Sequence, residues 1–289
     1  MRQIIMRKLL VAGIVLTAAM NTAQAADMPV KAPIPSAYNW TGFYLGANVG
    51  YGWGNRSADF AANDSASAFL FGIILPAAGG NPAPPTSFKS SGVLGGVQLG
   101  YNWQFNSTWL LGLETDIDWA GLKGSGSSGA TSFGGNQFVM TSEERIKWFG
   151  TVRARLGYLP MDNLLAYVTG GFAYGRVEHT APLDSTTGDI SAFHATFGYN
   201  CFAGTTCFAG SSSRIATGWT AGTGFEYAVW RNVTLKAEYL YVNLGGNSVT
   251  EPALVHATGA GATTALSSIT ANYSRTNFNV ARVGVNFRY

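Results

Sequence analysis

The feature that most constrains the fold is an alternation of apolar and polar residues that recurs along the chain. From Phe43 to Trp53 every odd position is apolar, whereas the even positions hold Tyr44, Asn48 and three glycines. Successive side chains of a strand point to opposite faces, so a period of two indicates a β-strand. Eight such segments are predicted as strands: 43–53, 93–105, 109–119, 146–158, 164–174, 215–229, 233–241 and 281–289.

The connections between these segments alternate in length. Three of them are short, at 106–108, 159–163 and 230–232, which makes the strands that they join antiparallel. The long connections are roughly 54–90, 120–145, 175–213 and 242–274. All long connections then leave one end of the sheet, which predicts an all-β, antiparallel up-and-down barrel with four long loops on one rim and short turns on the other.

The volume of the side chains decides which face of the barrel points outward. An eight-stranded barrel has an interior only just wide enough for side chains to fill it, and the apolar phase carries Trp, Tyr, Phe or Leu on nearly every strand. Charged residues make up 11% of the chain, against about 25% in an ordinary soluble domain. An outward face without charge suits lipid, so we predict a transmembrane barrel with glycines and charges inside.

Aromatic residues near both ends of the strands fit the girdles of a transmembrane barrel. The residues near the short turns are Trp103, Phe105, Trp109, Tyr158, Phe225, Tyr227, Phe287 and Tyr289. The residues near the long loops are Tyr51, Trp53, Trp119, Trp148, Tyr174, Tyr239 and Tyr241.

Residues 1–25 are predicted as a secretory signal peptide. A basic start precedes the apolar run 9–20, and Ala23 and Ala25 form a small-x-small cleavage site. An apolar run of 12 residues is too short for a transmembrane helix, which needs about 20. A retained signal anchor is the alternative.

The segment after the cleavage site, residues 26–39, is predicted as a Pro-rich tether, and residues 40–289 as the barrel domain. The chain has 18 Lys and Arg against 15 Asp and Glu, and cleavage removes three of the bases, which leaves no net charge. The balance argues against nucleic acid as a partner.

The charged residues of the strands fall in the polar phase, which faces the lumen. They are Glu114, Asp116, Asp118, Lys147, Arg153, Arg155, Arg214, Glu226, Lys236, Glu238, Arg282 and Arg288. Charges held away from bulk water need partners, so we predict a salt-bridge network that plugs the lumen. An ion-selective path or a carboxylate active site is the alternative.

Two segments leave a choice open. Phe278 and Val280 are out of phase with the run 281–289, which a β-bulge or an inward-facing apolar plug would explain. Cys201 and Cys207 are the only cysteines. In an exported chain they are predicted to form a disulfide that fixes an exposed loop tip, worth about 2 kcal/mol; a reactive thiol pair is the alternative.

Both ends of the mature chain resemble a known family. The start Ala26-Asp27, the opening 40–46 (WTGFYLG) and the last residues 282–289 (RVGVNFRY) are similar to the alphaproteobacterial opacity-like outer-membrane immunogenic proteins. The resemblance implies a small OmpA/OmpX-type surface barrel in the outer membrane of a Gram-negative cell. It also implies that Gly284, Phe287 and Tyr289 belong to the signal that such barrels show to the assembly machinery.

The histidines give little support to catalysis or metal binding. His179, His194 and His256 all fall in the long connections, without metal-ligand spacing. We therefore predict a non-enzymatic surface barrel without a cofactor, which serves envelope integrity and surface interactions through its loops. Its expected partners are outer-membrane lipid and lipopolysaccharide, the barrel-assembly machinery, and host or phage surfaces. The alternatives are a small pore or uptake protein for ions or a ligand such as haem, and a hydrolase with its site at the rim.

Overall fold

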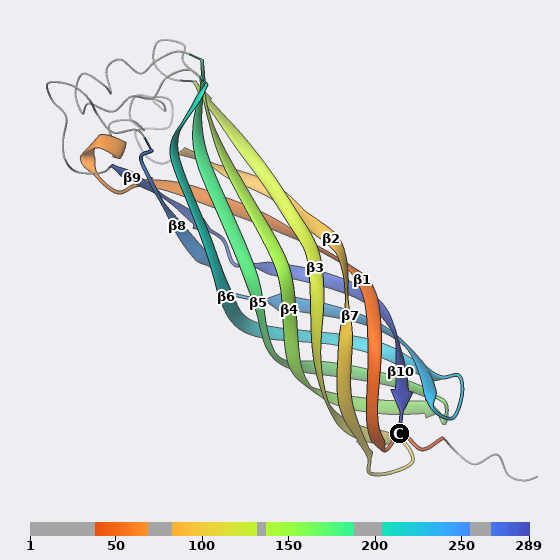
Figure 1. The fold of residues 1–289 in the computed structure, drawn as a ribbon. Helices are drawn as coiled ribbons and strands as arrows, with labels where there is room; N and C mark the ends of the chain where they lie inside the picture. The colour runs from red at the N-terminus through yellow and green to blue at the C-terminus, as the bar shows by residue number, and fades with distance from the viewer. Residues whose placement is uncertain (1–37, 69–82, 132–136, 188–203, 255–266) are drawn as a thin grey trace, which may run out of the picture. The chain divides into compact units, whose positions relative to one another are not determined.

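The computed structural model describes residues 38–68, 83–131, 137–187, 204–254 and 267–289, and these ranges contain ten strands in one sheet (Figure 1). The strands are β1 Gly42–Ala62, β2 Ala83–Gln104, β3 Trp109–Thr131, β4 Gln137–Met161, β5 Leu164–Thr187, β6 Thr205–Ala228, β7 Val233–Asn243, β8 Asn247–Pro252, β9 Ser268–Tyr273 and β10 Asn277–Arg288. Every pairing between them is antiparallel. Within the described ranges, no helix is both long and apolar enough to cross a bilayer.

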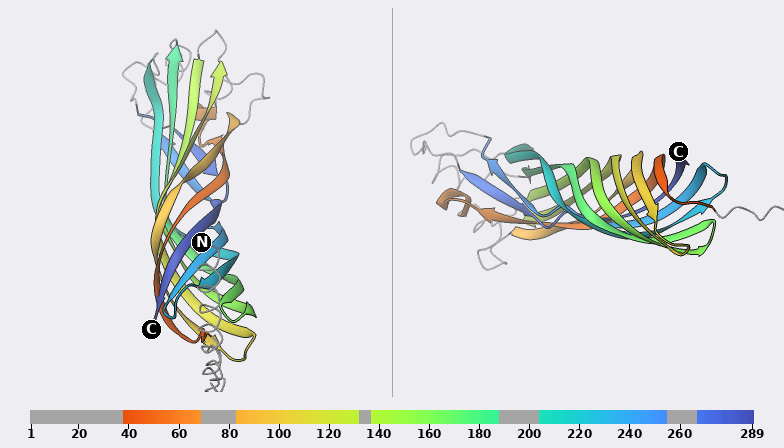
Figure 2. Two further views of the ribbon diagram at one scale, coloured as in Figure 1. Left: turned by 90° about the vertical axis from the view of Figure 1, so that its right-hand side faces the viewer. Right: turned by 90° about the horizontal axis from the view of Figure 1, so that it is seen from below.

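Backbone pairing joins eight of these strands in a ring. β1 pairs with β2 on one side and with β10 on the other, and β10 pairs in turn with β7. The ring therefore runs from β1 through β7 to β10 and back to β1. Figure 2 shows these strands inclined and wrapped around a common axis, as expected for a barrel.

The count of ten strands corrects the predicted eight, because the last two strands of the ring are each interrupted. The chain breaks between β7 and β8, where Gly245 has a φ of 75°, a conformation that glycine adopts easily. It breaks again at residues 274–276, between β9 and β10. β8 pairs with β9, β9 pairs with the end of β1, and Phe208 of β6 bridges to Ala253 just after β8.

The strands continue far into the segments predicted as loops, which is a second correction. We call the barrel from the short turns to the level of Trp53 the belt section, and the strand portions beyond it the extension. The extension comprises 54–62, 83–90, 121–131, 137–147, 175–187, 205–214, 247–252 and 268–273. These segments were missed because their outward residues are small or polar, as in Lys123 to Ser128 of β3.

The outward face of the belt section is apolar, which confirms the prediction. Phe43 is 61% exposed, Leu113 65% and Val93 69%, although such side chains are usually buried in a soluble protein. Trp53 and Trp119 are exposed near the loop end, and Trp103 and Phe287 near the turn end. Lipid is the solvent that suits this surface.

The lumen is filled by side chains that change character along each strand. The inward residues of β7 run from Thr234 through Lys236 and Glu238 to Leu240 and Val242, all buried. A charged layer is therefore followed toward the loop end by an apolar one. Buried residues of this apolar layer include Leu94, Leu122, Ile146, Phe149, Val177, Leu240, Phe278 and Val280.

The structure of β10 decides whether a β-bulge or an inward-facing apolar plug explains why Phe278 and Val280 are out of phase with residues 281–289. Phe278 and Val280 are fully buried, and the alternation continues through Arg282 to Arg288. The pairing of β10 with β7 and with β1 is regular over these positions. The apolar plug is therefore correct, and the bulge is not needed. Ile146, which was expected on the outward face, also lies in this plug.

Candidate functional site

The registers of neighbouring strands bring opposite charges together inside the belt section. Glu114, Asp116 and Asp118 take alternate inward positions on β3, and Glu114 lies directly opposite Arg153 of β4. Across the ring, Glu238 of β7 lies opposite Arg282 of β10. Adjacent strands thus supply ready-made pairs, and the small bore of the barrel brings these pairs within reach of one another.

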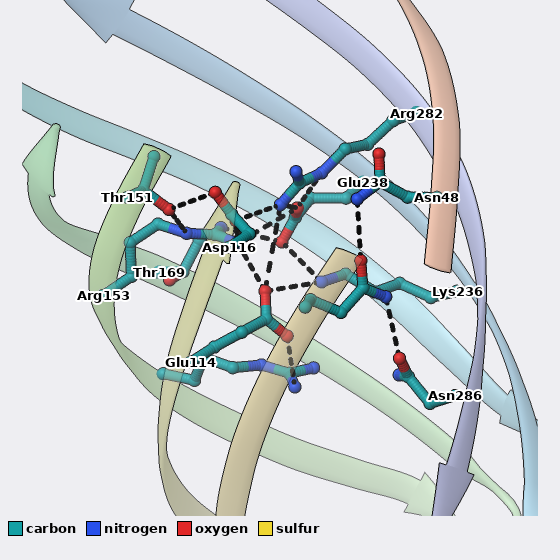
Figure 3. A network of polar contacts seen from close by, with 12 residues as sticks. Asn48, Glu114, Asp116, Thr151, Arg153, Thr169, Lys236, Glu238, Arg282 and Asn286 are labelled. Atoms are coloured by element: carbon teal, nitrogen blue, oxygen red, sulfur yellow. Dashed lines mark hydrogen bonds and ion pairs between the residues drawn. The ribbon is translucent and has the colours of Figure 1, made fainter. Parts of the chain in front are cut away.

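Arg153 and Arg282 form the centre of the network (Figure 3). Arg153 contacts Glu238 through Nη1 at 2.9 Å and Asp116 through Nη2 at 2.8 Å, and it also pairs with Glu114. Arg282 contacts Asp116 and Asp118 at 2.7 Å each and Glu238 at 2.6 Å. Two guanidinium groups therefore bridge four carboxylates that come from two strands.

Lys236 and Arg155 extend the network toward the turn end. Lys236 Nζ lies 2.6 Å from Glu114 Oε1, and Arg155 Nη2 lies 2.9 Å from Glu226 Oε2. Tyr44 donates its hydroxyl to Glu114 at 2.7 Å and accepts a hydrogen bond from Arg155 at 2.5 Å. The side chains of these ion pairs are 0–1% exposed, so the charges are satisfied by one another and not by bulk water.

Arg288 lies inside the barrel but belongs to a different contact. Its Nη1 donates to the carbonyl oxygen of Asn39 at 3.0 Å, and its guanidinium lies 5.1 Å and 5.4 Å from the ring centres of Tyr38 and Trp40. Trp40 is fully buried and donates its indole N–H to the carbonyl of Asp162 at 2.9 Å. The residues just before β1 therefore close the turn end, a role that the sequence did not reveal.

A second buried ionic cluster lies in the extension, and the sequence analysis missed it because its residues were expected in loops. Arg56 Nε donates to Glu144 Oε1 at 2.5 Å, and Glu144 Oε2 accepts hydrogen bonds from Thr276 at 3.0 Å and faces His179 Nε2 at 3.2 Å. Burial raises the pKa of Glu144, but the hydrogen bond with His179 and the charge of Arg56 outweigh it and hold this pKa below its usual value. Thr276 lies in the break between β9 and β10, so the cluster braces that break.

Two predicted members of the lumen network lie elsewhere. Lys147 points outward with 49% of its side chain exposed and lies 3.3 Å from Glu178. The register between β4 and β5 shifts between Ile146 and Trp148, so the inward positions of β4 change parity at this bulge. Arg214 is also exposed, and it donates to the carbonyl of Gly246 beside the break after β7.

The remaining predicted residues have varied positions. His179 lies inside the barrel on β5, not in a loop, and is 1% exposed. Gly284 is on the inward side of β10, whereas Phe287 and Tyr289 are 47% and 80% exposed at the turn end. Cys207 is disulfide-bonded and 3% exposed. Outside the described residues lie Cys201, His194, His256, the cleavage residues Ala23 and Ala25, the signal peptide 1–25 and residues 26–37 of the tether.

The arrangement is suited to filling the barrel more than to catalysis. Arg153 and Arg155 are among the largest fully buried side chains, so guanidinium groups occupy the lumen. Each carboxylate of the network has a basic partner, which leaves no free nucleophile or base among them. Within the described ranges, no three His, Cys, Asp or Glu residues are grouped so that they could hold a metal ion.

Known proteins resemble this chain along most of its length. The family model described as the outer membrane protein beta-barrel domain matches residues 12–288. The chain is 34% identical over 277 residues to the 31 kDa outer-membrane immunogenic protein of Brucella melitensis, and the match covers 93% of this chain and 94% of the relative. It is 28% identical over 213 residues to the 22 kDa outer membrane protein of Rhizobium leguminosarum bv. viciae, covering 74% of this chain and 68% of that protein. Among solved structures, OprG from Pseudomonas aeruginosa matches with a TM-score of 0.40 and 11% identity, over 88% of this chain and 98% of that chain.

Proposed function

Because the chain belongs to the family of outer membrane protein β-barrel domains, we propose that it is a non-enzymatic structural barrel with a plugged lumen. It contributes to the integrity of the outer membrane and holds an extension that presents the surface loops. In this proposal no ions or solutes pass through the lumen, and the protein contacts its surroundings through its outer surface and its loop end.

The observation that carries this proposal is the ion-pair network across the belt section. Arg153 of β4 contacts carboxylates of both β3 and β7, and Arg282 of β10 contacts carboxylates of the same two strands. An ion crossing the lumen would have to separate these pairs and then pass the apolar plug around Phe149 and Phe278, whose ring centres lie 5.3 Å apart. Both steps would expose charge to a medium of low dielectric constant.

Single-channel recording in planar bilayers tests this proposal. We expect the refolded protein to insert without discrete conductance steps, whereas a 16-stranded porin in the same bilayer supplies the positive control. Insertion is verified independently by protection of the belt section from protease in vesicles of the same lipid. Stable, sizeable openings of the inserted wild-type protein would contradict the plugged lumen.

The absence of enzymatic activity is a separate part of the proposal. Glu114, Asp116 and Glu238 are buried and paired inside the belt section, where a substrate would have to displace their partners. We expect the purified protein in detergent to release no product from acyl-ester or peptide substrates. Turnover that is lost on substitution of one of these carboxylates by its amide would overturn this part.

The haem alternative can be tested at the histidine that the structure describes. His179 faces Glu144 through one ring nitrogen and Asn247 through the other, each at 3.2 Å, so neither nitrogen is free to ligate iron. We expect the absorption spectrum of haemin mixed with the protein to be unchanged by His179→Ala. A Soret shift that disappears in this variant would revive uptake of haem.

A further inference from the structure

Basic side chains form an arc on the outside of the barrel, directly beyond the aromatic residues at the loop end of the belt section. Four adjacent strands contribute to it, and its members are Lys89 of β2, Lys123 of β3, Arg145 and Lys147 of β4 and Arg176 of β5. All five are exposed and lie in the outward phase of their strands. We call this set the basic arc.

The strand registers place the basic arc at one level. Ser91 of β2 pairs with both Trp53 and Lys123, and Lys123 pairs with Arg145. On the next strand, Arg176 lies opposite Trp148. Trp residues at the edge of an apolar belt sit at the level of lipid headgroups, and so the arc lies at or just above that level on the loop side.

The charges of the basic arc are only partly balanced by the protein. Arg145 pairs with Glu143, while Lys147 and Arg176 share Glu178 at 3.3 Å and 3.6 Å. Within the described part of the chain, the other two members, Lys89 and Lys123, form no ion pair. Lys123 and Arg145 also face each other directly across β3 and β4, where like charges are destabilising. An external anion would remove this repulsion.

The basic arc occupies one side and one end of the barrel. Across the ring, β1 and β7 carry Asn55 and Asn243 beyond their last outward aromatic residues, and β10 carries Asn279 on its outward face. Among the described residues at the loop end of that side, Arg275 in the break before β10 is the single exposed base. At the turn end, the exposed charges include one acid, Asp162, and one base, Arg231, which offset each other. The positive surface is therefore local, and a discrete anionic molecule fits it better than a general attraction to lipid on all sides.

We propose that the basic arc binds the phosphate groups of lipopolysaccharide in the outer leaflet. The lipid A part of that molecule carries its phosphates at headgroup level, and its acyl chains would lie on the apolar belt below. Guanidinium groups bind phosphate through paired hydrogen bonds, and lysines bind it as point charges. Long basic side chains can also reach along the surface to a headgroup while their stems stay on apolar residues. This binding is independent of whether the lumen conducts.

The test compares two variants that each lose two exposed positive charges. The arc variant is Lys123→Gln/Arg145→Gln, and the matched control is Arg231→Gln/Arg275→Gln, whose residues are exposed outside the arc. Binding of bisphosphorylated lipid A to the folded proteins in neutral detergent micelles is measured by titration with a fluorescent lipid A. One base near an anionic lipid surface changes affinity about fivefold, so the arc variant should bind about 30-fold more weakly and the control like wild type.

Further measurements identify the ligand and verify that each variant is folded. Dephosphorylated lipid A and phosphatidylglycerol should both bind wild type weakly, and the charge-preserving variant Lys123→Arg/Arg145→Lys should retain most of the binding. Unboiled samples on SDS gels verify that each variant is folded. Equal binding of lipid A by wild type and the arc variant would overturn the proposal. Equal binding of phosphatidylglycerol and lipid A by wild type would overturn it as well, because it would indicate general anionic attraction.

Discussion

The belt section and the extension are built from the same strands but have opposite polarity. In the belt section Val49 and Trp53 of β1 face outward, and the charged network lies inside. A few residues later on the same strand, Asp59 is exposed and Phe60 is buried. The inward positions of β1 stay even throughout, so the strand does not turn over. What changes is the outer solvent, from lipid to water.

This comparison shows that a barrel can hold two kinds of core in series. The extension has an apolar core of the kind found in soluble domains, which includes Phe60, Phe138, Met140, Leu183 and Phe208. The belt section cannot use the hydrophobic effect in this way, because its apolar side chains are already satisfied by lipid. On the turn side of the apolar plug, its interior relies mainly on ion pairs and hydrogen bonds, and an unpaired charged group there would be costly.

The largest effect is expected from Arg153→Ala, which would leave Glu114, Asp116 and Glu238 short of a partner. Removal of one member of a buried pair costs about 3–5 kcal/mol. The measurement is the urea midpoint of unfolding from lipid vesicles. Arg145→Ala, an exposed arginine on the same strand, is the matched control. Equal midpoints for the two variants would mean that the network is well hydrated and that the belt section is not held by it.

Phe60→Ala should affect the extension and spare the belt section. Truncation of a buried phenylalanine costs about 3 kcal/mol or more, and Phe60 is 1% exposed in the apolar core of the extension. We expect faster protease cleavage within the extension while the belt section remains protected. Asp59→Ala, at the exposed neighbouring position, should leave the cleavage rate unchanged. Simultaneous loss of protection in both sections would show that they unfold as one unit.

Glu251 should make the stability of the extension depend on pH. It is fully buried on β8, neither carboxyl oxygen has a hydrogen-bond partner among the residues that the structure describes, and burial raises its pKa from 4.5 to about 9. The pKa of Glu251 is higher in the folded state than in the unfolded state. The stability that is linked to its protonation is therefore fully present below pH 4.5 and is lost as the pH rises through about 9. Stability should fall by at most about 1.4 kcal/mol per pH unit within this window.

The protease protection of the extension, followed from pH 5 to pH 9, measures this dependence. Glu251→Gln should flatten the curve, because an amide has no proton to lose. Glu143→Gln, an acid that is partly exposed on the outward face of β4, is the control and should keep the wild-type slope. A slope that persists in Glu251→Gln would assign the dependence to another group.

The smallest effect is expected from Lys147→Ala. The exposed ion pair with Glu178 contributes about 0–1 kcal/mol, so the urea midpoint should scarcely move. A loss comparable to that of Arg153→Ala would return Lys147 to the lumen network, in disagreement with the bulge in β4. A comparison of the urea midpoints of the single variants Lys147→Ala and Arg153→Ala therefore tests the position of the bulge directly.

The belt section could be predicted from the sequence because lipid imposes a simple rule on it. The alternation, with an outward phase that carries no charge, predicts the strands and their inward charges, and the short connections add the antiparallel order. The alternation predicts that Glu114 and Arg153 point into the lumen. It does not predict their ion-pair partners across the lumen, because these partners lie on strands that are distant in the sequence. Trp40 was identified as the start of the domain, yet its burial depends on Arg288 and Asp162, which no local pattern links to it.

The extension could not be predicted in the same way. Water accepts small polar residues on its outward face, so a segment such as Lys123 to Ser128 has the composition of a loop even though it forms a strand. The bulge at Lys147 changes the parity of β4 without a glycine or proline to mark it. The break after β7 has a better signal, because Gly245 and Gly246 lie there.

The seam between β1 and β10 has a consequence for biogenesis. Its rungs, from Tyr44 with Arg288 to Trp53 with Asn279, unite segments that are almost the whole polypeptide apart. Because these two segments are the first and the last strands of the ring, the barrel cannot close before both are present. Until the final rung of this seam forms, β1 and β10 each carry a row of unpaired backbone groups, which inside lipid would be costly.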